Sequence, residues 1–196
     1  MRGPAIAHDP MREVTMRDGS RARWDLRDDA EAMAKGTDDP RWSLSLDGYL
    51  DALRREWSPT TTDPTVWRIE LARVEADPDL ALAQFNERDG GGRTVTLPDG
   101  TDVPRLPGIV RWMWDGEFCG AINARWQHGT TDLPPTCLGH IGYAVVPWKR
   151  RRGYATSALE QMLVLARDEG LPFVDIVTDD DNLASQGVVR ASGGLL

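Results

Sequence analysis

A short basic run followed by a glycine, in the last third of this chain, could bind an anion. It extends from Lys149 to Thr156 and has the sequence KRRRGYAT. An apolar segment typical of a strand precedes it, and an amphipathic segment typical of a helix follows it. The first backbone N–H groups of a helix have no partner within the helix and carry a positive dipole, which suits a pyrophosphate. Because Gly153 has no side chain to obstruct a phosphate, the pattern predicts an anion site over residues 150–155.

The alternatives to an anion site at this run are a solvated basic patch and a signal for nucleic-acid binding or nuclear import. A P-loop is excluded because Gly-x-x-x-x-Gly-Lys-Ser/Thr does not occur, and the turn also lacks the Gly-x-Gly-x-x-Gly of dinucleotide-binding folds. The formal net charge of the 196-residue chain is −8, which disfavours nucleic acid and anionic membranes as partners. The positive charge of the run is therefore local.

Two residues just before this run could move protons. His140 is the candidate general base, because its ordinary pKa is about 6.5 and it shares a strand face with Gly142 and Ala144, which leave room for a substrate. A structural hydrogen bond from His140 to a neighbouring strand is the equal alternative. Tyr143 lies on the opposite strand face and is a weaker candidate for catalysis.

Other kinds of chemistry find less support in the residue types. No serine or cysteine nucleophile stands beside a base, which favours direct attack by a substrate over a covalent enzyme intermediate. The two cysteines and three histidines lack the spacing of a zinc site, so no metal is expected. Reduced, packed thiols are the expected state of the cysteines.

The elements that would position these residues are clearest from residue 109 onward. Asp115-Gly116 is a strong hairpin signal between two apolar runs. Leu159, Met162, Leu163 and Ala166 form one stripe of a helix. The pattern predicts three antiparallel strands and then a helix, a strand and a helix, at residues 109–114, 117–126, 138–146, 156–169, 173–177 and 183–191.

The first half of the chain gives weaker signals. We expect a hairpin turning at Asp18-Gly19, helices over 28–35, 47–57 and 79–87, and a strand over 65–74. Residues 1–12 are predicted to be a loose tail and residues 13–196 a single domain, in which 59–108 elaborates a core of 109–196. No stretch approaches the roughly 20 apolar residues of a membrane-spanning helix, and the first residues lack the apolar core of a secretory signal. A cytoplasmic location is therefore expected.

Three segments together resemble the GNAT superfamily of N-acetyltransferases: GHIGYAVVPWKRRRGYAT at 139–156, VDIVT at 174–178 and NLASQGVVRASGG at 182–194. Arg150, Gly153 and Ala155 match the family's Arg/Gln-x-x-Gly-x-Gly/Ala motif for a pyrophosphate, and Asn182 and Ser185 match its Asn-x-x-Ser motif. The likeness is greatest to a poorly characterised branch of predicted acetyltransferases with Gly-His-Ile-Gly-Tyr before the motif and Ser-Gly-Gly after the last helix. It covers roughly residues 108–196.

The resemblance implies an α/β (α+β) fold with a mixed, mainly antiparallel central sheet flanked by helices, whose strands 138–146 and 173–177 splay apart. The family's last two strands have no counterpart here. Acetyl-CoA would be the co-substrate, and the main chain of Val145 and Val146 would pair with its pantetheine amides. The residues implied to bind it are Val145, Val146, Arg150, Arg151, Arg152, Gly153, Tyr154, Ala155, Thr156, Asn182 and Ser185.

The function that the resemblance implies is transfer of an acetyl group to an unidentified small-molecule or protein amine. A non-catalytic acyl-CoA-binding module is the alternative, because Val189 stands where many members carry a general-acid tyrosine. The absent strands would leave an exposed sheet edge, so a homodimer that covers this edge is a further expectation.

Overall fold

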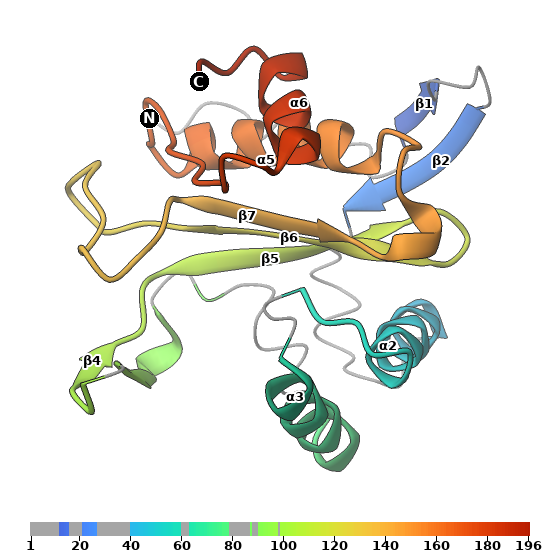
Figure 1. Ribbon diagram of the computed structural model, residues 1–196, viewed down its shortest axis with the longest axis horizontal. Coiled ribbons are helices and arrows are strands. Elements are labelled where there is room, and N and C mark those ends of the chain that lie inside the picture. The colour runs from blue at the N-terminus through green and yellow to red at the C-terminus, as the bar shows by residue number, and fades with distance from the viewer. Residues whose placement is uncertain are drawn as a thin grey trace, which may run out of the picture.

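The protein folds as one antiparallel sheet between two layers of helices (Figure 1). The computed structural model describes residues 12–15, 21–26, 40–59, 63–78, 87, 90–97 and 99–196. The strand order is β1 (Arg12–Thr15), β2 (Arg21–Leu26), β5 (Gly108–Trp114), β6 (Phe118–Arg125) and β7 (Ile141–Val145). Helices α5 (Tyr154–Asp168) and α6 (Leu183–Ala191) lie on one face, and α2 (Pro40–Arg54) and α3 (Pro64–Ala76) lie on the other (Figure 1).

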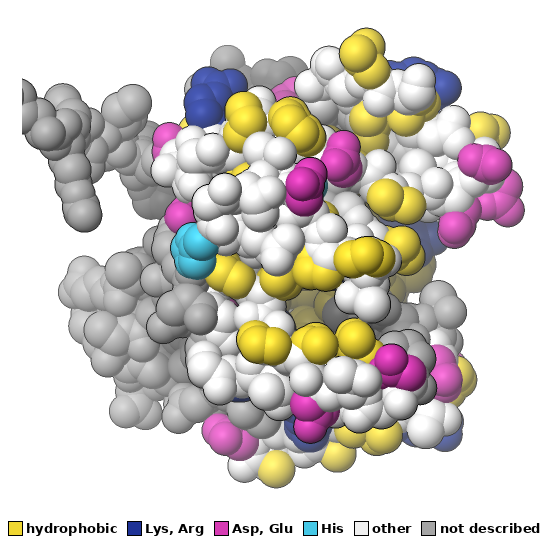
Figure 2. Space-filling view, turned by 90° about the vertical axis from the view of Figure 1, so that its left-hand side faces the viewer, with side chains coloured by type: hydrophobic (Ala, Val, Ile, Leu, Met, Phe, Trp, Pro, Cys, Tyr) yellow, Lys and Arg dark blue, Asp and Glu magenta, His cyan; other side chains and the backbone are white. Residues whose placement is uncertain are grey.

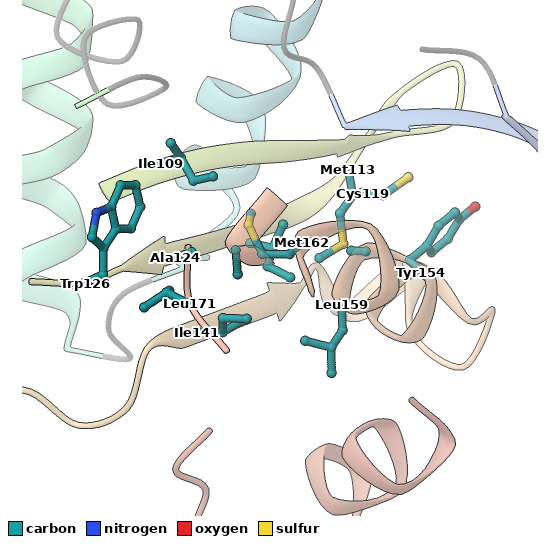
Figure 3. Close-up of a cluster of buried hydrophobic side chains, with 13 residues drawn as sticks. Ile109, Met113, Cys119, Ala124, Trp126, Ile141, Tyr154, Leu159, Met162 and Leu171 are labelled. Atoms are coloured by element: carbon teal, nitrogen blue, oxygen red, sulfur yellow. The ribbon is translucent and has the colours of Figure 1, made fainter. Parts of the chain in front are cut away.

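The face of the sheet under α5 holds the first of two apolar cores (Figure 3). The predicted stripe of α5 supplies Leu159 and Met162, both at most 1% exposed, and they pack against Ile122 and Ile141 of the sheet. The helix buries one face because its apolar residues recur every three or four positions. This packing fixes the start of α5, at Tyr154, beside the end of β7.

The opposite face holds the second core, under α2 and α3. Tyr49 of α2 stacks on Trp112 of β5 with ring centroids 4.9 Å apart, and Phe118 meets both rings edge-on. Leu53 and Val74 close the core from the two helices. Both faces of the central strands are thus buried, as expected for a sheet between two layers.

The strand predicted over residues 65–74 is wrong, because this segment lies in α3. Asp63 is the N-cap and accepts a hydrogen bond from Thr65 N at 2.8 Å, and Pro64 occupies the first turn, where its missing N–H costs nothing. Val74 then packs toward α2 while its neighbours stay exposed. The residues at the helix N-terminus therefore indicate a helix here, although the alternation of apolar residues over 65–74 suggests a strand.

The other predictions for the first half have mixed outcomes. The hairpin before residue 27 is confirmed, because β1 pairs antiparallel with β2. The helix predicted over 47–57 is confirmed as α2, which begins earlier, at Pro40. The helix predicted over 28–35 and almost all of that predicted over 79–87 lie outside the described residues. Within the expected elaboration, β3 (Thr94–Thr96) and β4 (Asp102–Pro104) form a small hairpin that the sequence did not indicate.

The C-terminal half follows the predicted order with one exception. The strands predicted at 109–114, 117–126 and 138–146 are β5, β6 and β7, and the two helices are α5 and α6. The strand predicted at 173–177 is wrong as a strand of the sheet, because no ladder joins this segment to β7. A backbone hydrogen bond joins the segment to His140, the residue before β7.

Candidate functional site

The turn before α5 leaves the first amides of the helix without a side-chain cap. Gly153 is the N-cap residue and has the left-handed conformation, with φ 93° and ψ 0°. It offers no side chain to accept from the first turn, and a Cβ placed on it would have nothing within 4 Å. Arg151 also has a positive φ, of 69°. A tight turn of this kind therefore presents backbone N–H groups to open space at the positive end of the helix dipole.

The four basic residues of the turn do not all contribute free charge to it. Lys149 is 6% exposed and forms an ion pair with Glu117. Arg150 is exposed, and its Nε donates to the carbonyl of Val145 at 3.2 Å. Arg151 and Arg152 are exposed. The positive charge available to an anion therefore comes from the arginines and not from Lys149.

The β5–β6 hairpin contacts both ends of this turn. At one end Glu117 forms an ion pair with Lys149, and at the other Asp115 accepts a hydrogen bond from the Tyr154 hydroxyl at 2.5 Å. Burial and this bond raise the pKa of Tyr154, so the phenol stays protonated and donating. The sequence indicates Asp115 only as a turn residue and gives no sign of either contact, because the partners of Asp115 and Glu117 are 39 and 32 residues away.

The edge of β7 that faces away from β6 is open next to this turn. Val146 donates its N–H to Cys119 O of β6 at 3.0 Å. Since hydrogen-bonded residues alternate in an antiparallel ladder, the backbone groups of Tyr143 and Val145 point away from β6. The structure thus offers the main chain of Val145 to a ligand, whereas the N–H of Val146 is already used within the sheet.

His140 closes the other end of this edge. Its N–H donates to Asp175 O at 2.7 Å, and its Nδ1 accepts from Asp175 N at 3.0 Å. The side chain is 1% exposed, and its Nε2 has no hydrogen-bond partner in the described part of the chain. The imidazole therefore takes the place of a second backbone bond, and the segment 173–177 is joined to the start of β7 at His140.

Tyr143 of β7 contacts the start of α6. The Tyr143 hydroxyl lies 2.8 Å from Ser185 Oγ and also donates to Ser185 O at 3.2 Å. Asn182 caps α6 by accepting from Ser185 N at 3.0 Å. Burial raises the pKa of Tyr143, so this phenol is protonated near neutral pH. The structure thus brings Tyr143, Asn182 and Ser185 together, and β7 carries the link from them to the turn at Gly153.

A cleft of about 910 Å³ is lined in part by the segment 173–177. It is lined by the loop 131–135, by Leu159 and Leu163 of α5 and by Val189 of α6. None of the residues expected to bind a coenzyme lines it. Hydrophobic side chains are visible at several places on this side of the molecule (Figure 2). The cleft and the open edge of β7 are therefore two different places.

The comparisons with known proteins point to one family. A family model described as an acetyltransferase (GNAT) domain matches residues 11–194. The chain belongs to the GNAT family. A search of the curated proteins gives no match. Among solved structures, the GNAT domain of S. lividans PAT is similar at 14% identity and a TM-score of 0.44, over 98% of this chain and 90% of that one.

Family membership gives this GNAT protein its general chemistry, which is transfer of an acetyl group from acetyl-CoA. Val189, at the position of the family's usual tyrosine, is 6% exposed and belongs to α6. No three His, Cys, Asp or Glu side chains gather into a metal site within the described ranges. Both cysteines are free. Of the helices that the structure describes, none is both long and apolar enough to cross a membrane.

Proposed function

We propose that this GNAT protein is an N-acetyltransferase that binds acetyl-CoA between β7 and the segment 173–177. The observation that carries the proposal is the uncapped start of α5 at Gly153 beside the open edge at Val145. The pyrophosphate would accept from the amides of residues 151–156, with Arg150, Arg151 and Arg152 around it. The pantetheine would lie along the edge, where the Val145 carbonyl accepts from Arg150 Nε and has a second lone pair for a pantetheine amide.

The reaction would proceed by direct attack. The nitrogen of a neutral amine bonds to the thioester carbonyl carbon and loses one proton to solvent water, the carbon–sulfur bond breaks, and the thiolate takes up one proton from a donor that solvent then reprotonates. Tyr143 is suited to supply that proton, because its hydroxyl lies in the gap beside Ser185 and its raised pKa keeps it protonated. Ser185 and Asn182 would then position the coenzyme arm at the start of α6.

His140 is better suited to a positioning role than to the role of base. Its Nδ1 accepts from a backbone amide and its side chain is almost fully buried, so a substrate amine would have no lone pair to reach at that nitrogen. What it does is hold the segment 173–177 against the start of β7.

Two measurements on the intact protein test the proposal. Saturating acetyl-CoA is expected to raise the melting temperature, and an amine panel is expected to release free thiol. Tyr143→Phe should lower kcat by roughly 100-fold while the acetyl-CoA dissociation constant changes little. Absence of any stabilisation by acetyl-CoA would refute the coenzyme site. Stabilisation without turnover on any amine would favour the non-catalytic binding module instead.

A further inference from the structure

Two arginines from the elaborated region converge on one buried carboxylate. Glu87 is 6% exposed, Arg93 pairs with its Oε1, and Arg105 Nε lies 2.8 Å from its Oε2. The backbone holds these arginines side by side, because Arg105 N donates to Arg93 O at 2.8 Å. The hairpin β3–β4 lies between the two in sequence and brings them together. One carboxylate therefore serves two guanidinium groups.

Two further arginines add positive charge to the same place. Burial lowers the pKa of Arg105, and so do the charges of Arg125 and Arg73; burial and the charges of Arg105 and Arg73 act in the same direction on Arg93. Glu87 is the carboxylate that the described residues place against Arg93 and Arg105. These five side chains carry four positive charges and one negative charge. The excess is notable in a chain whose formal net charge is −8.

The guanidinium of Arg125 lies over β7, close to the open edge. A Cβ on Gly142 would be 3.6 Å from Arg125 Nη2 and 3.3 Å from Asn123 Nδ2. Arg125 Nη2 also donates to Asn123 Oδ1 at 3.4 Å. Gly142 directly precedes Tyr143 and points to the face of the sheet that carries α2 and α3, because Ala144 on the same side packs into that core. The basic cluster is thus next to the edge along which the pantetheine would run.

We propose that the acceptor amine carries an anionic group, a carboxylate or a phosphate, that is bound by Arg125 and Arg105 with Asn123 beside it. The proposal rests on the proposed N-acetyltransferase function and names its substrate class. The guanidinium fork matches both anions in geometry. A partly buried group of like charges is stabilised when an anion enters it, so a ligand would complete the charge balance that Glu87 begins.

The test compares acceptors in matched pairs: amino acids with their carboxamides, and phosphoethanolamine with ethanolamine. At equal acetyl-CoA, kcat/KM for the anionic member of at least one pair is expected to exceed that of the neutral member by roughly 10- to 100-fold. The pair that shows the preference tells carboxylate from phosphate. Equal values in both pairs, or a preference for the neutral members, would overturn the proposal.

Variants then locate the preference. Arg125→Gln should reduce it to less than threefold while the stabilisation by acetyl-CoA stays at its wild-type value, and Arg73→Gln should reduce it in part. Arg167→Gln is the matched control, because Arg167 is exposed on α5, on the other face of the sheet. A preference that persists in Arg125→Gln would refute the assignment of the site.

A binding measurement separates this proposal from the proposed function. The same pairs are titrated into protein saturated with coenzyme A, by calorimetry. Tighter binding of an anionic member, lost in Arg125→Gln, supports the anion site even if no amine is turned over, in which case only the transferase proposal fails. Equal binding of all members overturns the anion site whatever the activity.

Discussion

The turn requires two properties of Gly153, and replacing this residue by alanine, beside a matched control, tells their effects apart. The first is the left-handed backbone, with φ 93°. The second is the empty space around the missing Cβ, where the protein itself has no atom within 4 Å. Gly170 offers a matched control at the other end of α5, because its φ is 89° and its Cβ position is equally empty. Both substitutions add one methyl group to a left-handed residue in open space.

The expected effects differ only in coenzyme binding. Alanine in the left-handed region costs about 1 kcal/mol, so each variant should melt roughly 2–4 °C below the wild type. At a ligand concentration of about 100 times the dissociation constant, acetyl-CoA should stabilise the wild type by about 2.7 kcal/mol. A methyl group at Gly153 would obstruct the phosphate and weaken binding by at least roughly tenfold, which removes about 1.4 kcal/mol of that stabilisation. Gly170→Ala should keep all of it.

The assay is thermal unfolding of the two variants and the wild type with and without acetyl-CoA. The two variants are expected to have similar melting temperatures without ligand, and Gly153→Ala alone is expected to show a smaller ligand-induced rise. If Gly153→Ala shows the full rise, no phosphate approaches that position and the coenzyme lies elsewhere. If both variants lose the rise, the loss comes from α5 as a whole and says nothing specific about the turn.

Three more predictions follow from named contacts. The pKa of Cys119 is raised to about 11, chiefly by burial, so the thiol should stay protonated in the folded state when it ionises in the unfolded chain. The free energy of unfolding should then fall by roughly 1 kcal/mol per pH unit as pH rises from about 9 to about 11, and urea unfolding of Cys119→Ala should show a flatter dependence below pH 10. Tyr154→Phe removes the bond to Asp115 and should weaken acetyl-CoA binding roughly 3- to 10-fold in titrations, with kcat nearly unchanged. His140→Ala leaves the Asp175 amide without its acceptor and should lower the free energy of unfolding by about 2–3 kcal/mol, while an unchanged pH dependence of kcat would agree with a positioning role.

The parts of the fold predictable from the sequence are those with local signals. The stripe of α5, the glycine before it and the apolar strands of the hairpin are each encoded within about 15 residues. They were therefore found with small errors at their ends. The strand predicted over 65–74 failed for a related reason: the deciding signals, Asp63 and Pro64, stand just before the window that showed the alternation. A helix N-cap is a stronger signal than a weak alternation of apolar residues, because its side chain satisfies backbone N–H donors that the alternation leaves without a partner.

The contacts that shape the site were not predictable, since each joins residues that are far apart in sequence. His140 meets Asp175 across 35 residues, and Tyr143 meets Ser185 across 42. The imidazole that occupies a backbone position also explains why the segment 173–177 has the composition of a strand but no ladder: its amide at Asp175 is already used by a side chain. A single sequence carries no sign of such a substitution of side chain for backbone.

The basic run at residues 149–152 shows that a charged side chain in a sequence motif need not be available to a ligand at the site. Of its four cations, Lys149 is neutralised by Glu117, and Arg150 reaches back to the Val145 carbonyl. The affinity of the turn for a pyrophosphate should therefore come mainly from the amides at the start of α5, which no side chain of the described residues caps, and less from the number of arginines. Arg151→Gln should then weaken acetyl-CoA binding less than Gly153→Ala does, although only the former removes a charge. The cluster around Glu87 has the opposite character: its four arginines come from separate segments, and Glu87 is the carboxylate that the described residues place against Arg93 and Arg105, so there the charge itself would select the ligand.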